Sequence, residues 1–223
     1  MRKTNLIPIL TVIILIFSAY CAYTGIFPKL FEFNKKDALS EWQEKVFKGK
    51  VLYEAKPENG GYLLAQSKEA CSGIFYKIKF DPKKYPMISW KWRVKEFPKK
   101  DKAVEGGGWM EKDDYPARIY VIFPALVFTN IRCIEYVWDE TLPKGTVMTS
   151  PYYGNIKLIV AESGKKHLQG WFSVERNILE DYKSAFKAVP AVVGAIAVMT
   201  DADNSLSSAE AEYTDIKVGY KNE

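Results

Sequence analysis

Apolar and polar residues alternate along most of this chain with a period of two, which is the pattern of half-buried β-strands. The clearest example is the segment Met87–Lys95. Its apolar residues fall on one face and its polar residues on the other: Ile88, Trp90, Trp92 and Val94 against Ser89, Lys91, Arg93 and Lys95. This segment predicts an antiparallel strand with one face on a core and the other in water.

The same pattern predicts further strands along the rest of the chain. They are Val51–Glu54, Tyr62–Ser67, Ile74–Phe80, Ala117–Phe123, Cys133–Asp139, Lys157–Glu162, Trp171–Asn177, Ala191–Met199 and Glu212–Tyr220. Helical spacing is confined to Ile178–Lys187, and Pro57–Gly61 has strong turn chemistry. About ten short strands with one short helix predict an all-β fold, an antiparallel β-sandwich of the jelly-roll type. A parallel sheet would need a helix between successive strands.

The N-terminal segment differs from the rest of the chain. Arg2 and Lys3 precede Leu6–Tyr23, a run of 18 residues without a charge. This is the layout of a secretory signal peptide or a short membrane anchor. We therefore expect residues 1–25 to be a signal peptide or N-terminal anchor, residues 26–45 a linker or docking segment, and residues 46–223 the sandwich domain. The protein is then exported to the periplasm, either anchored to the inner membrane or secreted after cleavage.

Charge argues against a nucleic-acid partner. Lys plus Arg total 32 and Asp plus Glu total 27, and the excess is spread along the chain in pairs such as Lys83-Lys84 and Lys99-Lys100. No basic helix or RNA-binding motif accompanies these pairs, so they are interpreted as solvated surface.

Cysteine and histidine are scarce. Beyond the N-terminal segment only Cys71 and Cys133 remain, and they are either one disulfide or two buried thiols. His167 is the only histidine, which argues against histidine-rich zinc sites and a Ser-His-Asp arrangement.

Strand alternation also groups the candidate ligand-binding residues. Arg118 points with Tyr120, Tyr136 with Trp138, and Trp171 with Ser173 and Glu175. If these three faces coincide, they form a concave surface with aromatic plates and charged groups, suited to stacking sugar rings. The alternative is that the aromatic residues are core and the charges form internal ion pairs.

Asp201, Asp203 and Asn204 offer hard oxygen ligands at close spacing, as calcium loops do. The longer EF-hand pattern is absent, and Asx-turn capping of a tight strand connection explains the same residues without a metal. No cofactor is expected, and a structural calcium ion is the one exception left open.

Catalysis in a chain so poor in histidine would need paired carboxylates. Candidates are Asp113, Asp114, Glu175, Asp181 and Asp201. Glycoside hydrolysis requires two such groups at a defined separation. The acidic triplet that many sandwich-fold glucanases carry on one strand is absent, because Trp171–Glu175 contains a single acid.

Several motifs together resemble the bacterial family DUF3047, a domain of unknown function. They are Trp90-x-Trp92-x-Val94, Asp113–Val121, Tyr136-Val137-Trp138, Trp171-x3-Glu175-Arg176-Asn177, Asp181-Tyr182 and Met199-Thr200-Asp201-x-Asp203-Asn204. The resemblance covers about Val46 to Val218 and implies export, with no assigned activity or catalytic residues to carry over. Ser205–Ser208 lacks the two glycines that the family pattern has here. The closing Ala-x-Tyr-x-Asp-Ile pattern also looks like the last strand of galactose-binding-like carbohydrate modules, an analogy of fold only.

Three functions remain open from the sequence. The leading hypothesis is a noncatalytic envelope module that binds a glycan or another polar ligand through Arg118, Tyr120, Trp138, Trp171 and Glu175. The second is a carboxylate-dependent hydrolase or lyase of envelope polysaccharide that uses Glu175 with Asp114 or Asp201. The third is a membrane-held structural or assembly protein whose partner is another envelope component.

Overall fold

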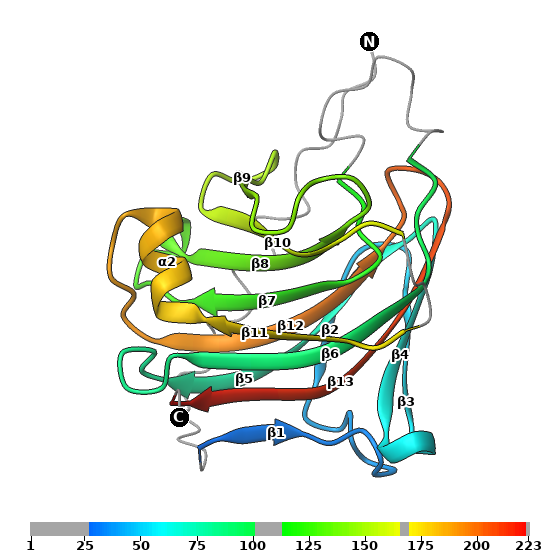
Figure 1. Cartoon of the computed structure of the whole chain (residues 1–223), viewed down its shortest axis with the longest axis horizontal. Coiled ribbons are helices and arrows are strands. Elements are labelled where there is room, and N and C mark those ends of the chain that lie inside the picture. The colour runs from blue at the N-terminus through cyan, green and yellow to red at the C-terminus, as the bar shows by residue number, and fades with distance from the viewer. Residues whose placement is uncertain (1–26, 101–112, 166–169, 222–223) are drawn as a thin grey trace.

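Two β-sheets pack face to face in the computed structural model of the chain (Figure 1). The structure describes residues 27–100, 113–165 and 170–221. The expectations for residues 1–25 and for His167 lie outside these ranges. No helix within them has the length and apolar character needed to cross a bilayer.

The first sheet, called sheet A, has the strand order β11-β6-β13-β4-β3, with β1 paired to β13. Its strands are β1 Lys29–Phe31, β3 Leu52–Lys56, β4 Tyr62–Lys68, β6 Met87–Glu96, β11 Phe172–Asn177 and β13 Ser208–Tyr220. All of its pairs are antiparallel.

The second sheet, called sheet B, has the order β2-β5-β12-β7-β8-β10-β9. Its strands are β2 Gln43–Lys48, β5 Cys71–Phe80, β7 Arg118–Phe123, β8 Arg132–Asp139, β9 Val147–Thr149, β10 Ile156–Ser163 and β12 Val193–Asp201. Helix α2 spans Ile178–Phe186, and two 3-10 turns span Glu58–Gly60 (η1) and Phe128–Asn130 (η4).

The jelly-roll-type sandwich predicted from the periodicity is confirmed, and each predicted strand and the helix has a counterpart. One pair departs from the antiparallel expectation, because β8 and β10 run parallel. The chain leaves β8, crosses to the far edge of the sheet as β9, and turns back antiparallel into β10. The insertion of β9 therefore gives β10 the same direction as β8.

An aromatic zipper fills the space between the sheets. Trp90 and Trp92 of β6 pack against Tyr136 and Trp138 of β8, with ring centroids 5.2 Å apart for Trp90–Tyr136 and 5.8 Å for Trp92–Trp138. All four residues are buried, which confirms the predicted inward face of β6. Edge and tilted contacts of this kind add to the free energy of burial itself.

Residues 27–45, which the sequence analysis assigns to a linker or docking segment, belong to the sandwich. Strand β1 pairs with β13, and β2 begins at Gln43 and pairs with β5. Phe31 and Phe33 are buried in the main core. The strand pairs and the two buried Phe side chains fix this segment against the sandwich. The alternating pattern did not predict it, because β1 is too short to show one.

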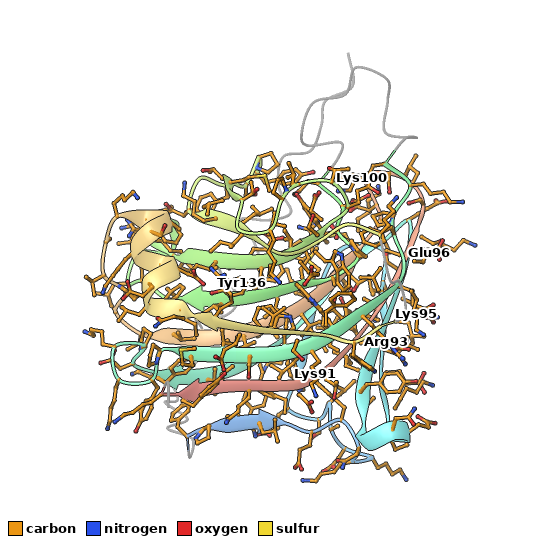
Figure 2. The ribbon with its side chains drawn as sticks, viewed as in Figure 1. Lys91, Arg93, Lys95, Glu96, Lys100 and Tyr136 are labelled. Atoms are coloured by element: carbon orange, nitrogen blue, oxygen red, sulfur yellow. The ribbon has the colours of Figure 1, made fainter. Side chains whose placement is uncertain are left out.

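Sheet B carries a second apolar cluster on its outer face. It includes Ile122, Val137, Leu158 and Ala195 and is covered in part by Tyr153 and Met148 from the segment between β8 and β10. Sheet B is therefore buried on both faces over much of its width, whereas the outer positions of β6 in sheet A carry Lys91, Arg93 and Lys95 (Figure 2).

Tyr213 links the two sheets through one buried hydroxyl. It lies on β13 of sheet A, donates to the Met199 carbonyl oxygen at 2.9 Å and accepts from the Arg118 N–H at 3.2 Å. Its oxygen is also 2.9 Å from Thr200 Oγ1. Arg118, Met199 and Thr200 belong to sheet B, so this hydroxyl fixes the position of one sheet relative to the other.

We expect Tyr213→Phe to lower the free energy of unfolding by about 1–3 kcal/mol, because it leaves buried backbone groups without a partner while keeping the ring. Urea denaturation followed by circular dichroism measures this loss. Tyr220→Phe is the control, since the Tyr220 hydroxyl lies in a more exposed position, where it donates to Glu175 at 2.8 Å. Equal stability of the two variants would contradict the role given to Tyr213.

Candidate functional site

The predicted ligand-binding residues lie in three separate environments. Arg118 and Tyr120 are on the outer side of sheet B, opposite the inward-facing Ile119 and Val121. Trp138 is in the inter-sheet core at 1% exposure, and its indole N–H donates to the Gly164 carbonyl oxygen. The hypothesis that the three faces form one surface is therefore wrong.

Trp171 and Glu175 stand apart from the other candidates, on the outer side of sheet A. The physical reason is that β7 and β8 belong to one sheet and β11 to the other. In addition, the phase of β8 turns Trp138 inward, so it meets Trp92 and Phe172 rather than a ligand.

The charged candidates converge on Arg118, in what we call the ionic centre: Arg118, Asp113, Glu135 and Asp201. Arg118 Nε and Nη2 donate to the two oxygens of Asp201 at 2.9 and 2.5 Å. Arg118 Nη1 donates to Glu135 at 2.6 Å, and Nη2 also donates to the Asp113 carbonyl oxygen. All four residues are buried, so these are internal ion pairs, as the alternative interpretation of the charges proposed.

Asp113 is the least satisfied member of the ionic centre. It is 5% exposed, and its Oδ1 has no hydrogen-bond partner among the described residues. Arg118 Nη1 lies 3.9 Å from this oxygen. Burial, and then the neighbouring carboxylates of Glu135 and Asp114, raise the pKa of Asp113 to about 7 against the pull of Arg118.

The acidic turn after β12 is organised by hydrogen bonds within the protein. Asp114 accepts from the backbone N–H groups of Asn204 at 3.2 Å and Ser205 at 2.7 Å. The Asn204 amide donates to the Asp113 carbonyl oxygen, and its oxygen lies 3.4 Å from the Tyr152 hydroxyl. These contacts explain the polar run as turn chemistry, in keeping with the metal-free interpretation.

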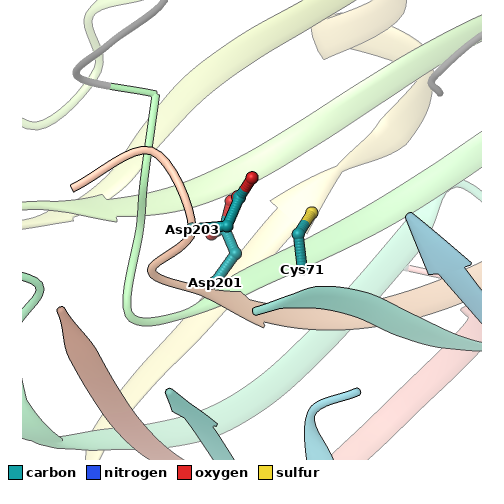
Figure 3. A group of neighbouring side chains, drawn as sticks. All are labelled: Cys71, Asp201 and Asp203. Atoms are coloured by element: carbon teal, nitrogen blue, oxygen red, sulfur yellow. The ribbon is translucent and has the colours of Figure 1, made fainter. Parts of the chain in front are cut away.

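The contacts of the residues predicted to hold calcium argue against a calcium site. Both oxygens of Asp201 already accept hydrogen bonds from Arg118, and Lys48 Nζ lies 3.6 Å from Asp203. Asp201 and Asp203 instead approach Cys71, with one ligand atom from each within 4.8 Å of the others (Figure 3). Calcium binds six to eight oxygen ligands, and a thiol does not suit it.

Cys71 and Cys133 are both free thiols. Burial is the main cause that raises the pKa of each thiol well above its usual range, and nearby carboxylates raise it further. Between the two alternatives left open by the sequence, the structure has two thiols and no disulfide joining them.

The outer face of sheet A carries the other cluster of candidate residues, which we call the Trp171 face: Trp171, Arg93, Tyr62 and Glu212. The Arg93 guanidinium lies 4.6 Å from the Trp171 ring centre and 5.8 Å from that of Tyr62. Glu212 forms an ion pair with Arg93 from the neighbouring strand β13. The arginine is thus held beneath two aromatic rings.

Glu175 lies apart from the carboxylates proposed to act with it in catalysis. Glu175 is on sheet A and accepts from the Tyr220 hydroxyl at 2.8 Å, whereas Asp114 and Asp201 serve the turn and Arg118 at sheet B. Asp181 of α2 accepts from Tyr136 and Arg176. Glu175 is therefore not paired with Asp114 or Asp201, as the hydrolase hypothesis requires.

Four residues of these clusters were not singled out by sequence reasoning: Arg93, Tyr62, Glu212 and Glu135. The outward phase of Arg93 was visible in the alternation of its strand. The neighbours of Arg93 could not be predicted, because the order of the strands in sheet A decides that β11 and β4 lie near it. Glu135 had a detectable signal, since it is an acid within the apolar run Cys133–Asp139.

We expect stability to fall as pH rises from about 4 to about 7, because folded Asp113 keeps a proton that the unfolded chain, with the ordinary pKa of 3.8, has lost. Asp113→Asn removes this titration. It should therefore exceed the native protein in free energy of unfolding above pH 7, by on the order of 2 kcal/mol, and lose that advantage below pH 4. Urea unfolding across this range tests it, with the exposed Asp37→Asn as control. If the free energies of unfolding of Asp113→Asn and the native protein change with pH in the same way, the raised pKa assigned to Asp113 is wrong.

We expect chelator and added calcium to leave the melting temperature unchanged, because Arg118 already occupies both oxygens of Asp201 and Lys48 lies beside Asp203. Thermal unfolding with EDTA and then with excess calcium measures this directly. A rise in melting temperature with calcium would show a site that this arrangement does not provide.

No curated protein matches the chain. Solved structures with a similar fold include the family 11 carbohydrate-binding module of the cellulosomal cellulase Lic26A-Cel5E of Clostridium thermocellum, with a TM-score of 0.46, 11% identity and coverage of 91% of this chain and 98% of that one. The family 30 carbohydrate-binding module of the cellulase Cel9D-Cel44B of the same organism has a TM-score of 0.45, 8% identity and coverage of 82% and 93%. The xyloglucanase domain of NopAA from Sinorhizobium fredii, in complex with cellobiose, has a TM-score of 0.42, 9% identity and coverage of 81% and 96%.

The resemblance noted in the sequence is confirmed by a match to a family model. The model is described as a protein of unknown function, DUF3047, and it matches residues 40–217. This span includes both the ionic centre and the Trp171 face, and the chain therefore belongs to the DUF3047 family.

Proposed function

We propose that this domain binds a glycan on the outer face of sheet A, with Trp171 as the stacking platform. The observation that carries the proposal is the exposure of Trp171. At 38% it is the one exposed tryptophan among the described residues. Exposing a large aromatic ring to water is unfavourable, and such a ring is a frequent anchor in binding surfaces.

The surroundings of Trp171 suit a sugar ring. Tyr62 stands 6.4 Å away, ring centre to ring centre, at 67°, so the two aromatic planes form a corner. Arg93 lies at this corner, while Ser173 and Glu175 continue along the same side of β11. A sugar presents apolar C–H faces and hydroxyl edges, which match an aromatic plate flanked by donors and acceptors.

The proposed role is binding without catalysis. Glu175 is the acid of the original candidate set that shares this side of the sheet with Trp171, and it is hydrogen-bonded to Tyr220. Glycoside hydrolysis needs a second carboxylate facing the same bond. Glu212, the other acid of the Trp171 face, is buried in an ion pair with Arg93. The other candidate acids lie in the ionic centre, the turn after β12 or α2, which favours a binding module.

The second part of the proposal is location. We place the domain outside the cytoplasm, at the inner membrane, with residues 1–25 as its attachment. Arg2 and Lys3 followed by the uncharged run Leu6–Tyr23 support this placement. The glycan would then be a component of the cell envelope.

We expect Trp171→Ala to weaken glycan binding by at least about tenfold, because it removes the stacking surface, and to change stability little, because the side chain is partly in water. A glycan array identifies a ligand, and isothermal titration calorimetry measures the affinity of both forms. Val46→Ala is the control, since Val46 is 39% exposed but lies on β2 of sheet B.

Two results would overturn the proposal. One is a ligand whose affinity is the same for Trp171→Ala and for the native protein. The other is equal weakening by Val46→Ala, which would trace the effect to a general loss of surface packing rather than to Trp171.

A further inference from the structure

We propose that one end of the sandwich rests on the surface of an anionic lipid bilayer. We call it the Phe27 end: Phe27, the 81–86 turn, the 124–131 turn and the 187–192 segment after α2. The inference rests on the proposed attachment through residues 1–25. It adds the orientation of the domain and the residues that meet the lipid.

These four segments lie together although they are distant in sequence. The Phe27 ring is 5.3 Å from Phe80 and 5.5 Å from Tyr85. Phe80 pairs with Val193 across the ladder between β5 and β12, and the next residue, Gly194, packs directly against Pro124. The start of β1, the ends of β5 and β7 and the start of β12 are gathered at this end, beside α2 (Figure 1).

The length of the connection places this end near the membrane. Four residue steps separate Tyr23, the last residue of the uncharged run, from Phe27. A fully extended chain spans at most about 14 Å over four residues. If the uncharged run sits in the bilayer, no other end of the sandwich comes as close to the lipid headgroups.

The chemistry of this end also suits an anionic interface. Leu126 is 94% exposed, Val189 61% and Val127 54%, which is a high exposure for apolar side chains. Exposed Lys83 and Lys84 are on the 81–86 turn, and exposed Lys187 follows α2. Apolar side chains that enter the headgroup region next to lysines that contact phosphates are the pattern of interfacial binding.

Nearby acids cancel only part of this positive charge. Asp81 is the one acid of the four segments; it is half-buried, accepts from the Lys83 backbone N–H at 2.9 Å and keeps its own charge, so three lysines against one acid leave a net positive charge. Glu180 on α2 is paired with Lys183 at 2.9 Å. Lys83, Lys84 and Lys187 thus remain as the cationic groups that face outward at this end.

The opposite end provides a matched reference position. Strand β12 runs from Val193 to Asp201, a rise of about 26 Å, and the turn that follows carries Leu206. Leu206 is 60% exposed, close to the value for Val189. It is as apolar as the residues of the Phe27 end and about as exposed as Val189 and Val127, although less exposed than Leu126, and it lies at the far end of the domain.

The test uses the full chain in vesicles of equal parts phosphatidylcholine and phosphatidylglycerol. Leu126→Cys and Leu206→Cys are made separately in a Cys21→Ser background and labelled with an environment-sensitive fluorophore. Cys133 is buried and Cys71 half-buried, and burial raises the pKa of both thiols, so we expect both to react more slowly than an exposed cysteine at position 126 or 206. A lipid carrying a spin label at its headgroup then quenches the fluorophores that are close to the membrane surface.

We expect strong quenching at position 126 and little at position 206. Lys83→Glu together with Lys84→Glu should weaken the contact by roughly fivefold for each lysine removed, so quenching at 126 should fall, as it should in vesicles of phosphatidylcholine alone. Equal quenching at the two positions, or stronger quenching at 206, would overturn the proposed orientation.

The failure of the attachment itself gives a different result. If residues 1–25 do not hold the chain in the bilayer, the protein leaves the vesicles in an alkaline carbonate wash, and neither position is quenched. A chain that stays with the vesicles but shows no quenching at 126 keeps the attachment and refutes the membrane contact of the Phe27 end.

Discussion

The buried guanidinium of Arg118 is the constraint on which one end of this sandwich depends. A charge removed from water must be matched, and here the partners come from three separate stretches of chain. Asp201 ends β12, Glu135 lies on β8, and Asp113 supplies a carbonyl oxygen from the segment that leads into β7. The Arg118 backbone N–H donates to Tyr213 of sheet A, so the same residue also connects the two sheets. Removing one partner would leave a charge buried without compensation.

This arrangement separates stability from binding between the two sheets. The outer face of sheet B is occupied by the ionic centre and by the second apolar cluster, and most of its polar groups already have partners within the protein. The outer face of sheet A is different, because its charged residues surround an aromatic ring that is partly in water. A surface whose groups are already matched internally gains little from a ligand, whereas an exposed tryptophan gains apolar contact from one. This contrast favours the Trp171 face over the cluster with more charges.

The strands could be predicted from the sequence, but which strands lie next to each other could not. A period of two is visible wherever a strand buries one face, which is why the segment Met87–Lys95 was assigned correctly together with its inward side. The identity of the adjacent strand depends on the whole sheet order, so neither the contact of Arg93 with Trp171 nor the burial of Trp138 could be derived. The acidic turn illustrates the same limit. Asp201 looks like a metal ligand until its partner is known, and Arg118 lies 83 residues earlier.

The two proposed surfaces fit one placement of the domain. Asn177 pairs with Met87, just after the 81–86 turn at the Phe27 end, and Trp171 precedes Asn177 by six positions along β11. Six strand residues rise about 20 Å, so a bilayer at the Phe27 end leaves Trp171 well above the headgroups. A glycan that runs parallel to the membrane at that height would cross the outer strands of sheet A instead of lying along them. The corner formed by Trp171 and Tyr62 reaches across intervening strands of the sheet, which is the direction such a chain would follow.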